Sequence, residues 1–278
     1  MRKHAYIHIH VPKAAGSMFW EILKMNFGNE LKADYPSPSY YPLPKEALNW
    51  ALYQYPYRCF TSHNYNLSSV DTSLCKFDAF AFVRDPVAKF ISYYFFNRGI
   101  PQTADWHATK THSFTDYVRL LAENPLHFGF QTDISQQDML SGITGSSIEI
   151  VEESVDAGLL NLFPTEKFDE AMVVLEKKFP TDFKDCSYSK KINTSGRDQK
   201  ISKEDLDLIE QVSWIEKDRA LWNYSQNCLN RAIEENFSSK MEFDALLQQF
   251  RDRCLKKSAS CQRNFKTKVK SKIKSIIK

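Results

Sequence analysis

One lysine stands among small residues near the N-terminus, between a predicted strand and a predicted helix. Alternating apolar residues at about 5–11 predict the strand, and the stretch 17–27 predicts the helix. Between them the chain reads Lys13-Ala14-Ala15-Gly16-Ser17-Met18. A small-residue loop that opens a helix offers backbone N–H groups and the positive end of the helix dipole to an anion, and Lys13 adds a full charge. The segment therefore predicts a site for a phosphate-type anion.

An arginine ends a second predicted strand. The strand at 78–84 is almost continuously apolar, as expected for a strand covered on both faces in a parallel sheet, and it ends at Arg84. Asp85 and Pro86 then supply an N-cap and a proline at the first helical position, which predicts a helix over 86–97. A charged side chain is thereby placed at the junction of a buried strand and a helix.

A histidine ends a third predicted strand, at 57–62. Lys13, His63 and Arg84 thus each follow directly on a strand. Ligands of parallel α/β sheets bind at the carboxyl ends of the strands, so these side chains are expected to share one site. A Walker A loop has its glycines before the lysine, whereas here the lysine precedes the glycine, which disfavours a nucleoside triphosphatase.

Two of these segments together resemble a known family. Pro-Lys-x-Ala-Gly-Ser at residue 12 and Arg-Asp-Pro-x-x-x-x-x-Ser at residue 84 are similar to the cofactor-binding elements of sulfotransferases that use 3′-phosphoadenosine-5′-phosphosulfate (PAPS). The resemblance is closest to carbohydrate sulfotransferases of the 2-O-sulfotransferase type. It implies an α/β fold, a three-layer P-loop-like domain with a central, mainly parallel sheet and a helical C-terminal part.

The resemblance also implies roles for individual residues. Lys13 and His63 would be catalytic: Lys13 at the leaving phosphate oxygen, where charge builds in the transition state, and His63 as the base for the acceptor hydroxyl. Arg84 and Ser92 would hold the 3′-phosphate, with no metal needed. The implied cofactor-binding set is Lys13, Ala14, Ala15, Gly16, Ser17, Met18, Arg84, Ser92 and Arg197. The reaction would move a sulfuryl group from PAPS to a carbohydrate hydroxyl and release 3′-phosphoadenosine-5′-phosphate (PAP).

Three positions depart from the family pattern. Ala14 stands where a threonine is usual, Met18 where a second hydroxyl is usual, and Lys89 where many relatives carry arginine. These departures motivate one alternative, a nucleotide-binding module that binds PAP without turnover. The other alternative is a P-loop kinase, which the residue order around Lys13 disfavours.

The remaining pattern predicts alternating strands and helices with a distinct C-terminal end. A further strand is predicted at 161–165, and further helices at 44–54, 113–123, 131–141, 149–159, 168–179, 202–212 and 214–236. We divide the chain into a sulfotransferase domain, 1–250, and a basic tail, 251–278. Residues 253–278 hold 10 Lys and Arg and no Asp or Glu, while the other 252 residues hold 27 basic and 34 acidic side chains.

Composition and charge limit which classes of partner the protein can have. A chain of 278 residues with 42% hydrophobic residues can bury one substantial core. The acidic body argues against a nucleic-acid partner.

No apolar run reaches the roughly 20 residues of a membrane helix, and no secretory segment follows the first residues, so a cytoplasmic enzyme with reduced cysteines is expected. Apolar residues at helical spacing in the tail predict a basic amphipathic helix at the inner face of the membrane; a frayed solubilising tail is the alternative.

Overall fold

A parallel β-sheet forms the centre of the molecule. A computed structural model describes residues 4–34, 48, 56–69, 73, 75–101, 106–123, 135–189 and 201–276. In these ranges the sheet has five strands in the order β2-β3-β1-β4-β5, and every neighbouring pair is parallel. The strands are β1 (His4–Ile9), β2 (Leu31–Asp34), β3 (Cys59–Ser62), β4 (Lys76–Val83) and β5 (Leu160–Pro164).

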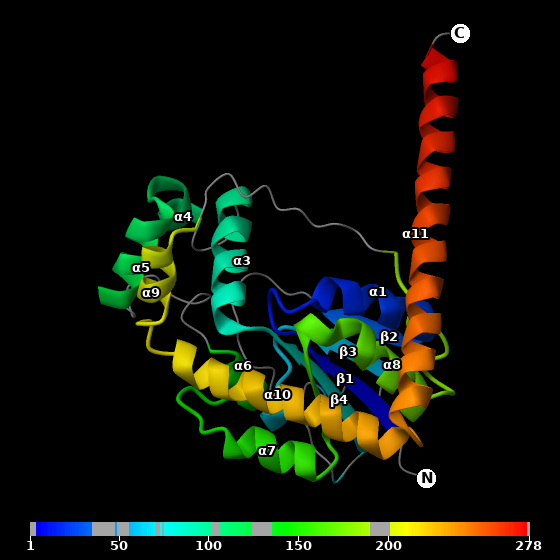
Figure 1. The fold of residues 1–278 in the computed structure, drawn as a ribbon, viewed down its shortest axis with the longest axis horizontal. Helices are drawn as coiled ribbons and strands as arrows, with labels where there is room; N and C mark the ends of the chain where they lie inside the picture. The colour runs from blue at the N-terminus through cyan, green and yellow to red at the C-terminus, as the bar shows by residue number, and fades with distance from the viewer. Residues whose placement is uncertain are drawn as a thin grey trace.

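Helices flank this sheet and fill most of the C-terminal half (Figure 1). They are α1 (Gly16–Phe27), α3 (Pro86–Gly99), α4 (Trp106–Thr111), α5 (Phe114–Glu123), α6 (Gln136–Ser141), α7 (Glu149–Asp156), α8 (Phe168–Lys178), α9 (Lys203–Ile209), α10 (Ile215–Asn236) and α11 (Lys240–Ile276). Short 3₁₀ turns lie at η1 (Gly28–Glu30), η2 (Leu67–Ser69) and η3 (Thr165–Lys167). The predicted α/β class, with a central parallel sheet and a helical C-terminal part, is confirmed.

Aromatic side chains pack one face of the sheet against α1 and α8. Phe19 of α1 lies with its ring centroid 6.1 Å from Phe80 and 4.9 Å from Phe82, two residues that share a face of β4. Phe168 of α8 lies 5.1 Å from Phe82. Burying such rings is the main source of stability in a core of this kind. The packing fixes α1, and therefore the loop before it, against the sheet.

A second buried cluster joins α3, α4, α5 and α9, which lie together on one side of the sheet in Figure 1. Phe90 of α3 contacts Phe114 of α5, and Tyr94 contacts Tyr117, at centroid distances of 6.2 and 5.2 Å. Trp214, just before α10, lies 6.2 Å from Phe90. The cluster holds α3 from the side opposite its contact with the β1–α1 loop.

The structure contains three elements that the sequence pattern does not predict in full. Strand β2, helix α4 and the part of α11 before residue 251 fall in segments with no predicted element, whereas a helix in the tail itself is predicted. The first half of α11 packs on the body through buried Phe243, Leu247, Phe250 and Cys254, and its far end projects beyond the rest of the molecule (Figure 1). The division placed at 250 therefore lies inside one continuous helix.

Other predictions fall partly outside the described residues. Only Leu48 of the helix predicted at 44–54 is described. Of the helix predicted at 131–141, residues 131–134 lie outside the described ranges, and α6 begins at Gln136. The five cysteines whose side chains are described are buried, and none of these five forms a disulfide bond. Within the described ranges, no helix has the length and apolar content needed to cross a membrane.

Candidate functional site

The loop from β1 to α1 has the backbone of an anion site. Lys13 and Ala15 adopt left-handed conformations, with φ of 63° and 60°. A non-glycine residue in this region costs about 1–3 kcal/mol and is often kept for function. Ala15 is the N-cap of α1, and no described side chain caps the helix there. Backbone N–H groups at an uncapped helix start, beside left-handed residues, are suited to an anion.

Gly16 is required where this loop meets the strand. A Cβ atom at position 16 would lie 1.7 Å from Nε2 of His10, so the histidine ring occupies the space of a side chain. The His10 side chain is 6% exposed. The first residue of α1 therefore packs directly on the end of β1, and an ordinary side chain would force the two apart.

The two sequence motifs meet at Arg84. In the register of the sheet Ile9 pairs with Ala81, so β4 continues two residues past the end of β1. Arg84 follows β4, and its Nη1 donates to the carbonyl oxygen of Lys13 at 3.2 Å. The chain moves to the other side of β1 between β3 and β4, and such reversals of strand order are where ligands bind in open α/β sheets.

Lys13 sits over an aromatic ring rather than in open solvent. Its Nζ lies 4.0 Å from the ring centroid of Phe96 on α3, the distance of a cation–π contact. Burial, with a contribution from the positive charge of Arg84, lowers the pKa of Lys13 to about 8. Ser92 lies one turn before Phe96 on the same face of α3, which places it on the face that contacts the loop.

His63 is joined to the same loop through His10. In the sheet Ile9 pairs with Ser62, so the two histidines are level, and their rings stack with centroids 4.0 Å apart. Nδ1 of His63 lies 2.6 Å from the backbone carbonyl of His10. Because a carbonyl only accepts, Nδ1 carries the proton and Nε2 carries the lone pair. Burial lowers the pKa of His63 below its ordinary 6.5.

His8 extends this stack into the core. It lies on the same face of β1 as His10, with centroids 5.1 Å apart, and its Nδ1 shares a 2.8 Å hydrogen bond with Thr61. Burial lowers the pKa of His8 to about 3 and holds that of His10 well below 6.5. The structure therefore keeps three neutral imidazoles in a row, of which His63 lies at the strand end.

The backbone of Arg84 is held by a buried glutamine that the sequence analysis does not single out. Gln136 Oε1 accepts from the Arg84 N–H at 2.9 Å, and Gln136 Nε2 donates to the Arg84 carbonyl at 2.8 Å. The next N–H, of Asp85, donates to Glu166 Oε1 at 3.1 Å. Asp85 in turn caps α3 by accepting from the Ala88 N–H, as predicted.

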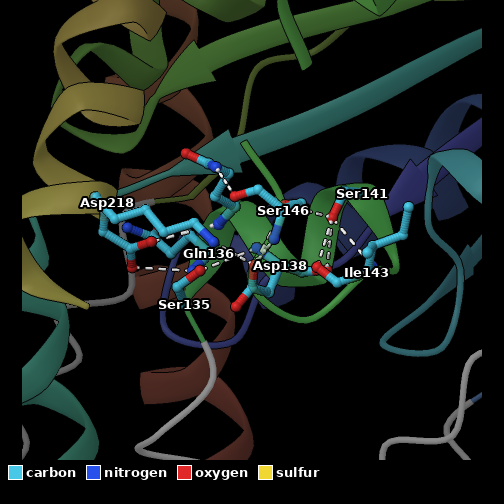
Figure 2. A network of polar contacts seen from close by, with 9 residues as sticks. Ser135, Gln136, Asp138, Ser141, Ile143, Ser146 and Asp218 are labelled. Atoms are coloured by element: carbon cyan, nitrogen blue, oxygen red, sulfur yellow. Dashed lines mark hydrogen bonds and ion pairs between the residues drawn. The ribbon is translucent and has the colours of Figure 1, made fainter. Parts of the chain in front are cut away.

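A buried ion pair supports Gln136. Asp218 of α10 accepts from the N–H groups of Gln136 and Gln137, which open α6, at 2.9 and 3.3 Å. Lys89 Nζ lies 3.8 Å from the Asp218 carboxylate, and both side chains are buried. Burial raises the pKa of Asp218, against the opposing effect of Lys89 and the two N–H groups. Figure 2 shows Asp218 beside Gln136 at the start of α6.

The predicted site residues fall into three groups in the structure. Lys13, Gly16 and Arg84 lie together at the carboxyl edge of the sheet. Ser92 lies one turn from Phe96, which contacts Lys13, and His63 stacks on His10, which contacts Gly16. Among the loop residues, Ser17 is exposed, Ala14 is buried, and Met18 packs against the main core with its N–H bonded to the Ala15 carbonyl. Arg197 lies outside the described residues.

Comparisons with known proteins leave the family open. No family model and no curated protein matches the chain. Among solved structures, the mouse sulfotransferase SULT7A1 complexed with PAP aligns over 90% of this chain and 89% of its own, at 13% identity and a TM-score of 0.39. At this identity and score the likeness has no weight for function. The function of this chain is therefore inferred from its own residues.

Proposed function

We propose that the protein is an O-sulfotransferase that uses PAPS as donor and a carbohydrate hydroxyl as acceptor. The observation that supports this best is the bond from Arg84 to the carbonyl of Lys13, which joins the two motifs at one edge of the sheet. Two cations and an uncapped helix start in contact form a site for a ligand with more than one anionic group. The two-motif resemblance supports PAPS as that ligand and a carbohydrate as acceptor.

The residues present fit such a donor. Gly16 lets the first residue of α1 pack directly on His10, which fixes where the first N–H groups of the helix lie. Lys13, Ser17 and the first N–H groups of α1 would hold the 5′-phosphosulfate end, and Arg84 with Ser92 the 3′-phosphate. When bound, the donor supplies the sulfuryl group and the phosphate oxygen from which that group departs. Lys13 supplies positive charge at that oxygen and Arg84 at the 3′-phosphate, so the proposal requires no metal.

His63 is the proposed base. Its Nε2 carries the lone pair because Nδ1 is bonded to the carbonyl of His10. Its lowered pKa keeps the ring neutral near pH 7, which is the form able to take a proton from a hydroxyl. The His10 carbonyl fixes the tautomer and can stabilise the charged ring that forms, a role that carboxylates and carbonyls play beside other histidine bases.

The deciding experiment is calorimetric titration with PAP of wild type, Arg84→Ala and Arg119→Ala. Arg119 is an exposed arginine paired with Glu204 and serves as the matched control. Removing a charge-assisted, bidentate phosphate contact is expected to weaken PAP binding by about tenfold or more, while the control stays within about twofold.

Two results would count against the proposal. Wild type that does not bind PAP would remove the donor assignment. Wild type that binds PAP but transfers no sulfuryl group to any carbohydrate acceptor would favour the non-catalytic module instead. If turnover is found, His63→Ala is expected to abolish it and to leave PAP binding intact.

A further inference from the structure

Gln136 meets a need that arises where β4 ends. Val83 is the last residue of the strand, so the peptide groups of Arg84 lie just beyond the strand and, being partly buried polar groups, need hydrogen bonds there. The amide of Gln136 satisfies both, through its oxygen to the N–H and its nitrogen to the carbonyl. Flipping the amide would set donor against donor and acceptor against acceptor, so only one orientation is allowed.

The two bonds from the Gln136 amide to Arg84 form a clamp, and the clamp is itself held by surrounding contacts. The Gln136 side chain is fully buried, and its own N–H is bonded to Asp218. Ser135 caps the start of α6 by accepting from the Asp138 N–H at 3.0 Å (Figure 2). The Asp218 carboxylate is paired with Lys89. A buried amide whose oxygen and nitrogen both bond to Arg84, on a helix start that is itself bonded to Asp218, can hold a backbone in one place.

Arg84 is the group whose position this clamp determines. Its Cα is fixed by the two bonds from Gln136, and its guanidinium reaches across to the Lys13 carbonyl. Displacement of the Arg84 backbone would change where the guanidinium points. The start of α1 follows β1 rather than β4, so its N–H groups are expected to move less.

We infer that Gln136 is a positioning residue that aims Arg84 and so sets how strongly the protein prefers a 3′-phosphorylated nucleotide. This inference rests on the proposed function, in which Arg84 holds the 3′-phosphate. The bond runs between positions 52 apart in the chain, so through Gln136 and its support Asp218 the helices α6 and α10 would influence donor recognition.

The test compares two ligands, PAP and adenosine 5′-monophosphate, which lacks the 3′-phosphate. Gln136→Met keeps the side-chain volume and removes both bonds to Arg84. We expect the preference for PAP over the monophosphate to fall by about tenfold, the effect of losing one well-placed charge-assisted contact. Affinity for the monophosphate itself should change by less than about twofold.

Gln137→Met is the matched control. Gln137 is the adjacent glutamine, equally buried, but its Nε2 donates to the Ser146 carbonyl at 2.6 Å and not to Arg84. It should keep the wild-type preference. If Gln136 had only a structural role, Gln136→Met would weaken the binding of both ligands by the same factor. That result, or an unchanged preference in folded Gln136→Met, would overturn the inference.

A second variant covers the case in which Gln136→Met does not fold. Gln136→Asn keeps a neutral amide but shortens the side chain by one methylene, so the amide no longer reaches both peptide groups of Arg84; a loss of preference is expected, and no loss would overturn the inference. Failure of the proposed function looks different. Wild type itself would then bind PAP no more tightly than the monophosphate, and the role of Gln136 would fall with that of Arg84.

Discussion

Lys13 and His63 enter the proposed reaction in opposite protonation states. His63 must be neutral to accept a proton, and Lys13 must be charged to stabilise the leaving oxygen. The environment shifts both pKa values downward through burial, below 6.5 for His63 and to about 8 for Lys13. The window in which both groups have the required charge therefore lies between these two values.

This window predicts a bell-shaped pH profile for kcat/KM, which reports groups of the free enzyme. Activity rises with pH as His63 loses its proton, so more than half of the His63 population is already competent at pH 6.5. It falls again as Lys13 loses its proton near pH 8. The measurement is kcat/KM for the donor across this range.

Lys13→Arg separates the two limbs. Arginine remains charged at every pH at which a protein is folded, so the variant should lose the alkaline limb and keep the acid limb. A variant profile that still falls near pH 8 would show that another group is responsible and would remove Lys13 from the assigned role.

At the scale of single residues, the charged groups of the site can be predicted from the sequence, but the residues that contact and hold them cannot. Lys13, His63 and Arg84 can be located because each ends an apolar strand, and parallel strands bring such ends together. Gln136 and Phe96 give no such signal. Their partners lie far away in the chain, and a glutamine or a phenylalanine in a helix is more often ordinary packing than part of a site.

The β1–α1 loop is the element on which the site depends most. It combines two left-handed residues with a glycine pressed against His10. Gly16→Ala is expected to destabilise the protein by about 1–3 kcal/mol, the range for overpacking, and to weaken PAP binding because the loop must move. Urea unfolding and the PAP titration measure the two effects.

A double variant tests whether the clash is the cause. His10→Ala removes the ring that a Cβ at position 16 would meet, so Gly16→Ala should cost much less in that background. Equal costs in the two backgrounds would mean that backbone freedom at Gly16, and not contact with His10, is what matters.

Other elements were predictable only where their own residues carry the pattern. The apolar run of β4 and the N-cap at Asp85 predict strand and helix correctly. Strand β2 is four residues, Leu-Lys-Ala-Asp, with no β-branched residue, and its structure comes from pairing with β3. Its existence depends on a neighbour that the local sequence does not reveal.

At the scale of the whole molecule, α11 joins the tail to the body. Phe250 and Cys254 are buried, and Lys257 Nζ donates to the Ser187 carbonyl at 2.8 Å and pairs with Asp185. The basic character of 253–278 led the sequence analysis to divide the chain at 250. Charge along a helix reports what faces solvent, and does not report the few apolar residues that face the core.

Two truncations test this reading. Ending the chain after residue 260 keeps these contacts and should leave the free energy of unfolding within about 0.5 kcal/mol of wild type. Ending it after residue 249 removes Phe250 and Cys254 from the core and should cost at least about 3 kcal/mol, the loss typical for one buried phenylalanine. Urea unfolding of the two truncated chains measures both free energies. Equal stability of the two would contradict the packing of residues 250–260 on the body.

The contact between His10 and Gly16 also limits how this sequence can change over evolutionary time. Because the imidazole occupies the volume that a Cβ would need, a residue larger than glycine at position 16 requires a smaller side chain at position 10. Relatives that carry a larger residue at the glycine are expected to carry a smaller one in place of His10. The two positions should therefore covary, and the pair would identify distant relatives more securely than Lys13 alone, since a lysine in a loop occurs in many unrelated proteins.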